Sequence, residues 1–152
     1  MLMLRVPKAS ELPTLSDLCL RSKGYWGYDA EFLEACREVL TIQPGELKLD
    51  HVWVAENSGG IAGVLHVQTD SEEAVLDKLF IDPDAMGLGA GRALFDKAVE
   101  IMKSDGAKIM SIDADPEAAG FYRKMGAITV GRVPSTVIEG RTLPLMRYSL
   151  EA

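Results

Sequence analysis

A glycine-rich loop that joins a strand to a helix is the feature that most constrains the fold of this chain. The apolar run from Ala74 to Ile81 predicts a strand, Pro83 ends it, and Gly87-Leu88-Gly89-Ala90-Gly91 leads into a helical pattern that extends to about Lys103. At such a junction free backbone N–H groups and the positive end of the helix dipole point outward. Because glycines lack a Cβ, an anion can approach the main chain closely, and the loop predicts a phosphate-binding site.

Other phosphate-binding motifs fit this loop less well. No Gly-Lys-Ser/Thr follows that would complete a nucleoside-triphosphate loop, and the spacing Gly87-x-Gly89-x-Gly91 differs from the dinucleotide fingerprint. A tight strand-to-helix turn with close packing remains the structural alternative to anion binding.

Apolar periodicity supplies the other elements. Strands are expected at residues 2–6, 51–55, 61–67, 108–112, 128–133 and 143–150, and helices after caps at Ser10 and Asp29 and at residues 117–125. This order predicts a mixed α/β sheet with helices packed against it. With 152 residues, 47% of them hydrophobic, and no linker or repeat, the chain is expected to form one domain over residues 1–152.

Charge and apolar patterning narrow the classes of partner. The net charge of −7, with Lys and Arg spread along the chain, argues against nucleic acid as a partner. Arg5, Pro7 and Lys8 interrupt the opening apolar run, and no later segment reaches spanning length, so neither a signal peptide nor a membrane partner is expected. Cys19 and Cys36 lie in helical patterns and are expected to be reduced and packed. The chain is therefore expected to be cytoplasmic.

A second motif follows about thirty residues after the loop. Phe121 and Tyr122 lie in a short helical pattern that Gly126 ends, and taken alone Phe121 reads as core and Tyr122 as core or surface. The two motifs occur in a fixed order: Leu79-Phe80-Ile81-Asp82-Pro83, then Gly87-x-Gly89-x-Gly91-Arg92-Ala93-Leu94, then Ala118-x-x-Phe121-Tyr122-x-x-x-Gly126. Over about fifty residues this closely resembles the core of the GNAT superfamily of N-acetyltransferases. Ser22-Lys23-x-x-Trp26-Gly27-Tyr28 and Gly140-Arg141-x-Leu143-Pro144-Leu145 resemble a branch of small, mostly uncharacterised members.

The resemblance implies a fold, a reaction and a set of coenzyme contacts. The fold would be a mostly antiparallel sheet of about six to seven strands flanked by about four helices, and the protein would be an enzyme that moves an acetyl group from acetyl-CoA to a primary amine. No metal is expected. The implied coenzyme-binding residues are Leu79, Phe80, Ile81, Met86, Gly87, Leu88, Gly89, Ala90, Gly91, Arg92, Asp115, Ala118 and Phe121. Two of them depart from the family pattern, which usually has Gln or Arg at Met86 and often Asn at Asp115.

Two residues are expected to carry the chemistry. Tyr122 would face the sulfur and, with an ordinary pKa of about 10, would be protonated at neutral pH and able to donate a proton to the departing thiolate. Asp77 is the candidate base, acting through water as in related enzymes; its alternatives are a solvated strand carboxylate or a partner for Lys78. Glu73 and His66 compete with it for the role of base.

The acceptor site is expected to involve the early helices and the hairpin that the strands at residues 51–55 and 61–67 would form, with Trp26, Tyr28 and Glu34 as candidate lining residues. Trp26-Gly27-Tyr28 reads equally well as a loop anchored in the core. The sequence identifies no particular amine. A non-catalytic acetyl-CoA sensor or interaction module of the same fold is the alternative function. We expect the closing strands to pair two copies into a homodimer.

Overall fold

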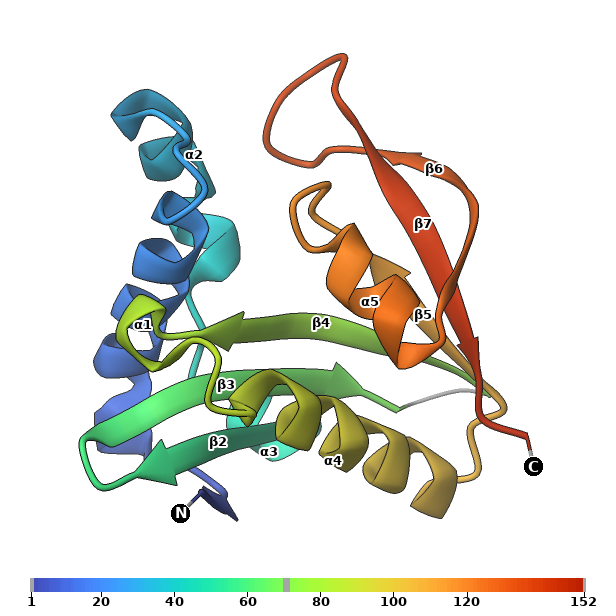
Figure 1. The fold of residues 1–152 in the computed structure, drawn as a ribbon, viewed down its shortest axis with the longest axis horizontal. Coiled ribbons are helices and arrows are strands. Elements are labelled where there is room, and N and C mark those ends of the chain that lie inside the picture. Colours follow the sequence, from blue (N-terminus) through green and yellow to red (C-terminus); the bar gives the residue numbers. More distant parts are fainter. Residues whose placement is uncertain (1, 70–71, 152) are drawn as a thin grey trace.

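The computed structural model describes residues 2–69 and 72–151, in which a twisted sheet carries helices on both faces (Figure 1). The strands are β1 (Met3–Arg5), β2 (His51–Asn57), β3 (Gly60–Gln68), β4 (Glu73–Ile81), β5 (Ile109–Asp113), β6 (Ile128–Pro134) and β7 (Thr142–Ser149). The helices are α1 (Leu12–Gly24), α2 (Ala30–Leu40), α3 (Glu46–Leu49), α4 (Ala90–Ser104) and α5 (Ala119–Met125), with 3-10 turns at Ala9–Glu11 and Pro83–Ala85.

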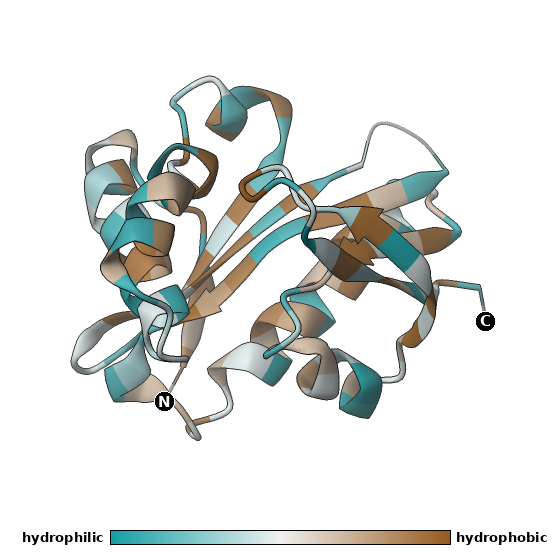
Figure 2. Ribbon diagram, turned by 90° about the horizontal axis from the view of Figure 1, so that it is seen from above, coloured by the Kyte–Doolittle hydropathy of each residue, from teal (hydrophilic) through white to brown (hydrophobic). Residues whose placement is uncertain are grey.

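The sheet confirms the mixed architecture that the order of elements predicts and the mostly antiparallel pairing that the family resemblance implies. Its seven strands run in the order β1-β2-β3-β4-β5-β7-β6, and β4 with β5 is the parallel pair. One core cluster joins α4 and α5 to the sheet, and a second joins α1 and α2 to β2 and β3. Figure 2 shows helices on either side of the central strands. Both faces of the central strands are thus covered.

Of the two N-caps predicted from the sequence, Asp29 is confirmed and Ser10 is wrong. Asp29 caps α2 as expected, since its Oδ1 accepts a hydrogen bond of 2.8 Å from the Phe32 N–H. Ser10 does not cap α1: it lies inside the 3-10 turn at Ala9–Glu11, and the α-helix begins only at Leu12. The sequence also missed α3, because four residues are too few to show a helical period.

A β-bulge at Asp77 shapes the centre of the sheet. His66 of β3 pairs with Lys78 and the next residue, Val67, pairs with Leu76, so Asp77 is an extra residue in β4. The bulge exchanges the faces of the strand: Ala74 and Leu76 before it, and Leu79 after it, all pack into the core cluster under α4.

The bulge coincides with the point where β4 and β5 separate. Their pairing covers Glu73 to Val75 on β4 and Ile109 to Ser111 on β5 and stops there in the described residues. Beyond it both strands continue, to Ile81 and Asp113. The strand ends therefore diverge and open a gap in the sheet.

Among the described residues, none of the helices combines the length and the apolar character that a membrane span needs.

Candidate active site

The glycine-rich loop adopts the conformation that only its glycines favour. Gly87 has φ +81° and Gly89 has φ +88°, both in the left-handed region, and Gly89 is the N-cap of α4. The helical hydrogen bonds begin with the Ala93 N–H, which donates to the Gly89 carbonyl. The N–H groups of the preceding residues in the first turn of α4 lack intrahelical acceptors, so the loop presents donors and the positive end of the helix dipole.

A cavity of about 600 Å³, here called the loop cavity, lies between this loop, the end of β4 and α5. It brings together twelve of the thirteen residues expected to bind a coenzyme: Leu79, Phe80, Ile81, Met86, Gly87, Gly89, Ala90, Gly91, Arg92, Asp115, Ala118 and Phe121. Leu88 is the thirteenth, and its side chain is exposed. Arg92 and Lys124 add positive charge to the lining, which suits an anionic ligand.

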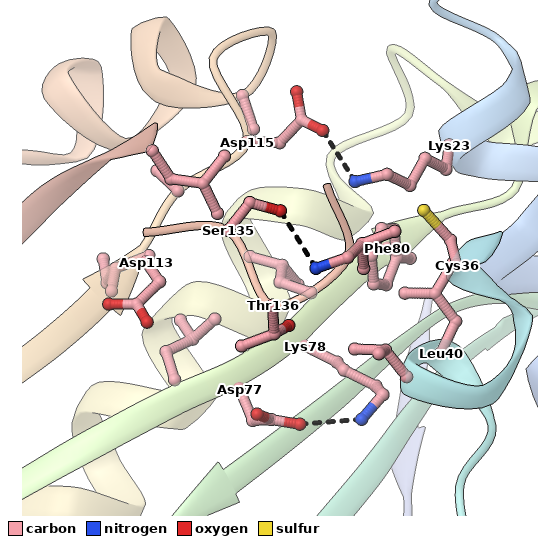
Figure 3. Close-up of a pocket in the computed structure, with 18 of the residues that line it drawn as sticks. Lys23, Cys36, Leu40, Asp77, Lys78, Phe80, Asp113, Asp115, Ser135 and Thr136 are labelled. Atoms are coloured by element: carbon pink, nitrogen blue, oxygen red, sulfur yellow. Dashed lines mark hydrogen bonds and ion pairs between the residues drawn. The ribbon is translucent and has the colours of Figure 1, made fainter. Parts of the chain in front are cut away.

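A second cavity of about 270 Å³, here called the strand-gap cavity, occupies the opening between β4 and β5 (Figure 3). Apolar residues of α2, among them Phe32, Val39 and Leu40, form one wall. Pro134 at the end of β6 and residues 135–137 of the β6–β7 connection form another. The two cavities share lining residues: Lys23, Leu79, Phe80, Asp115, Ala118 and Tyr122. A ligand in the loop cavity can therefore meet a second ligand in the strand-gap cavity.

Tyr122 stands where the two cavities meet. Its side chain is 5% exposed and packs beside Phe95 and Phe121, and no residue in the described parts of the chain hydrogen-bonds to its hydroxyl. Burial raises the pKa of the phenol, and the Asp115 charge raises it further. The phenol therefore stays protonated at neutral pH and has a proton to donate.

Asp77 belongs to a cluster of charges at the bulge. Its Oδ2 lies 2.7 Å from the Lys78 ammonium and 3.2 Å from His66 Nδ1, although Nδ1 forms no hydrogen bond of good geometry. Burial alone would raise the Asp77 pKa, but His66 and Lys78 outweigh it and lower the pKa to about 2. A carboxylate with this pKa holds its negative charge firmly and is a weak base.

Behind Asp77 the charge cluster continues to the α3 segment. His66 is fully buried, and its Nε2 lies 2.8 Å from Asp50 Oδ2. Burial lowers the His66 pKa, but the carboxylates of Asp77 and Asp50 raise it more, so the net shift is upward. Glu46, His66 and Asp77 also offer ligand atoms within 4.8 Å of one another. A cation bound there would lie next to the Lys78 ammonium, which already neutralises Asp77.

Asp115 is tied to three residues far away in the sequence. Lys23 Nζ lies 2.8 Å from its Oδ2, the Tyr28 hydroxyl donates to its Oδ1 at 2.9 Å, and Arg141 donates to the Tyr28 oxygen at 3.0 Å. Burial opposes ionisation of Asp115, but the hydrogen bond from Lys23 leads the contacts that lower its pKa below the ordinary value. These contacts connect the β5 end with the α1–α2 junction and the β6–β7 connection.

The candidate acceptor residues do not share one place. Trp26 lines the loop cavity, and Tyr28 lies in the Asp115 network. Glu34 lines neither cavity; its side chain is 69% exposed and pairs with Arg37. Glu73 pairs with Arg147 at 3.2 Å, away from both cavities.

Asp113, the last residue of β5, is a residue of the site that the sequence did not indicate. Its carboxylate lines the strand-gap cavity together with Asp77. Asp113 is an exposed residue, but partial desolvation of its carboxyl at the cavity wall raises its pKa, and the neighbouring Asp77 charge raises it further. No local motif marks this residue, because it is an ordinary strand-end aspartate until β4 and β5 diverge.

Comparisons with known proteins agree with this geometry. A family model described as an acetyltransferase (GNAT) domain matches residues 25–150. The peptidyl-lysine N-acetyltransferase YjaB of Escherichia coli is 37% identical over 74 residues, which cover 49% of this chain and 48% of that protein. A putative ribosomal-protein bS18 alanine N-acetyltransferase of Bacillus subtilis is 30% identical over 79 residues, covering 50% and 52%. The matches span about half or less of the length of these curated relatives.

Solved structures share the fold over nearly the whole chain. A GCN5-related N-acetyltransferase from Rhodopseudomonas palustris has a TM-score of 0.81 at 22% identity, with 97% of this chain and 94% of that chain covered. The PaiA N-acetyltransferase of Thermoplasma acidophilum, in complex with coenzyme A, has a TM-score of 0.78 at 17% identity, with 98% and 99% covered.

Proposed function

This chain belongs to the GNAT acetyltransferase family, and on that premise we propose that it transfers the acetyl group of acetyl-CoA directly to a primary amine. The observation that carries the proposal is the meeting of two cavities at Tyr122, the larger one bordered by an anion-binding loop and the smaller one open to a second substrate. Direct transfer needs this arrangement, because the amine and the thioester must reach each other in one site.

The coenzyme would occupy the loop cavity. N–H groups from Gly87 to Arg92 would hold its pyrophosphate, and the edge of β4 beyond the pairing with β5 would bond the pantetheine arm. Met86 offers no polar contact to the phosphates. Asp115 is already neutralised by Lys23, so its carboxylate does not confront the coenzyme as a free negative charge. Neither Met86 nor Asp115, the two departures from the family pattern, removes the backbone N–H donors of the loop.

Tyr122 would protonate the leaving group. The amine nitrogen attacks the thioester carbonyl carbon, the C–N bond forms, and a main-chain N–H near Phe80 holds the oxyanion. As the C–S bond breaks, the thiolate takes the phenolic proton of Tyr122 and leaves as a thiol. The second proton that the nitrogen loses restores the phenol, so Tyr122 ends each cycle protonated.

Asp77 would act through its charge. The sequence indicates Asp77 as a base, but a carboxylate with a pKa of about 2 is a weak proton acceptor at neutral pH. Its negative charge would balance the Lys78 ammonium and the neighbouring His66 at the edge of the gap. We therefore propose an electrostatic role for Asp77 within the acceptor site.

The cellular setting follows from the co-substrate and the thiols. Acetyl-CoA as co-substrate and two free, buried cysteines, Cys19 and Cys36, favour a cytoplasmic location. A second copy would most readily pair through β6, the strand at the end of the sheet, where Ile128 and Val130 are exposed. Size-exclusion chromatography with light scattering would test this dimer.

A thermal-shift panel followed by an acceptor screen tests the proposed function. Acetyl-CoA at one hundred times its dissociation constant should stabilise the protein by about 2.7 kcal/mol, whereas ATP and NAD should not. Amines, peptides and aminoglycosides would then be screened with detection of the released thiol. Stabilisation without consumption of acetyl-CoA by any amine would instead indicate a sensor, and stabilisation by ATP or NAD alone would refute the coenzyme assignment.

A further inference from the structure

Every charged group that lines the strand-gap cavity, except one, has an ion-pair or hydrogen-bond partner among the described residues. The cations are Lys23, Lys78 and Arg141, and the carboxylates are Asp77, Asp113 and Asp115. Lys23 pairs with Asp115 at 2.8 Å, and Lys78 pairs with Asp77 at 2.7 Å. Arg141 donates to the Tyr28 hydroxyl, which itself donates to Asp115. Asp113 alone among these six has neither an ion pair nor a hydrogen bond to any residue that the structure describes.

The strand register places Asp113 at the mouth of the gap. Val75 pairs with Ser111 in the last parallel step between β4 and β5. If the register continued, Asp113 would stand opposite Asp77, but the bulge at Asp77 has by then separated the strands. The side chain is exposed to the cavity, and Figure 3 shows it on the opposite side of the gap from Asp77. Tyr122 lines the same cavity.

We propose that Asp113, a residue without assigned role, is the catalytic base that takes the proton from the acceptor ammonium. The proposal rests on the proposed acetyl transfer. An ammonium entering the gap meets Asp113 as the carboxylate that no cation occupies, and transfers one proton to it to become a neutral amine. The nitrogen lone pair then attacks the thioester carbon, and Asp113 later releases its proton to water through the open cavity. Each cycle thus releases one proton, because the ammonium loses two and the thiol retains one.

The charge environment supports Asp113 over Asp77 in this role. Asp77 faces Lys78 and His66, which stabilise its ionised form. Asp113 faces the negative charge of Asp77 and a partly apolar cavity, and both raise its pKa. A carboxylate with a raised pKa is the stronger base of the two.

Two amines of similar size separate a base from a structural residue. Ethylamine is almost entirely protonated at neutral pH, whereas 2,2,2-trifluoroethylamine is largely neutral and needs no base to become a nucleophile. Asp113→Asn should lower kcat/KM for ethylamine by about 10²- to 10⁴-fold and for trifluoroethylamine by less than about tenfold. The exposed helix residue Asp96 supplies the control: Asp96→Asn removes the same charge outside both cavities and should leave both values unchanged.

The outcomes distinguish the base from the function on which it rests. Equal losses for the two amines, or no loss for either, would overturn the role of Asp113 while acetyl transfer stands. If the wild-type protein acetylated neither these amines nor any acceptor in the screen, the proposed function would fall and the base with it. Melting temperature and acetyl-CoA binding of Asp113→Asn would be measured first. Asp113→Ser, with the same expected split, would replace a variant that does not fold.

Discussion

Replacing Asp77 by asparagine is expected to destabilise the protein by about 3 kcal/mol. Lys78 is 6% exposed, its Nζ lies 2.7 Å from Asp77 Oδ2, and among the described residues no other carboxylate lies within ion-pairing distance of it. Removing one partner of a buried ion pair costs about 3–5 kcal/mol, because the remaining charge stays buried and unpaired. The Asp77 side chain is 37% exposed toward the gap, so water screens the pair and the lower end of that range applies.

A double-mutant cycle isolates this effect. Asp77→Asn combined with Lys78→Met removes both charges and keeps an apolar stem, so the double variant should lie within about 1 kcal/mol of the wild type. Equilibrium unfolding in urea of the wild type, both single variants and the double variant should give a coupling free energy of about 2–3 kcal/mol. Glu34→Gln, which breaks the exposed pair with Arg37, is the control and should cost less than about 0.5 kcal/mol.

Two results would refute this reasoning. If Asp77→Asn cost less than about 1 kcal/mol, the Lys78 ammonium would not depend on Asp77 for its neutralisation. If the double variant were as unstable as Asp77→Asn, the cost would come from the bulge geometry and not from an unpaired charge. The first result would also change how activity losses in Asp77 variants are interpreted, because a loss of folded protein would no longer explain part of them.

Three further predictions concern the site. Tyr122→Phe should lower kcat about 100-fold or more with an unchanged melting temperature and acetyl-CoA affinity, since the hydroxyl has no hydrogen bond to the described residues; full turnover would remove Tyr122 from the mechanism. Gly89→Ala should lower the free energy of unfolding in urea by about 1–2 kcal/mol and weaken acetyl-CoA binding. The cause is the backbone angle φ of +88°, since an added Cβ would meet no atom within 4 Å; Gly45→Ala, at φ −63°, is the control. Stability should fall as the pH drops from about 4 to 2, because the Asp77 pKa is lowered from 3.8 to about 2 and its contribution, complete above 3.8, is lost on protonation. The double variant should lose less stability over this range in acid unfolding, since it lacks the Asp77 share and keeps that of other carboxyls with a lowered pKa, such as Glu11.

Local sequence patterns determined most of the fold. The apolar periods gave the seven strands and four of the five α-helices, and Asp29 capped its helix as its side chain predicts. Gly87 and Gly89 form the expected strand-to-helix loop, since positive φ angles at successive turns require glycine. These features depend on neighbours within a few residues, so the sequence displays them directly.

The composition of the site depended on contacts between distant segments. The Asp115 network joins residues 92, 87 and 113 positions apart, and no local pattern marks such pairs. The one inserted residue in β4, Asp77, exchanges the faces of the strand and lies where β4 separates from β5. Lys78 and His66 lower the pKa of Asp77, so its carboxyl is ionised at neutral pH. The sequence by itself indicated a coenzyme loop and Tyr122. Only the tertiary structure decided which carboxylate in the gap is left without a cation, because the pairing of charges depends on where β4 and β5 diverge.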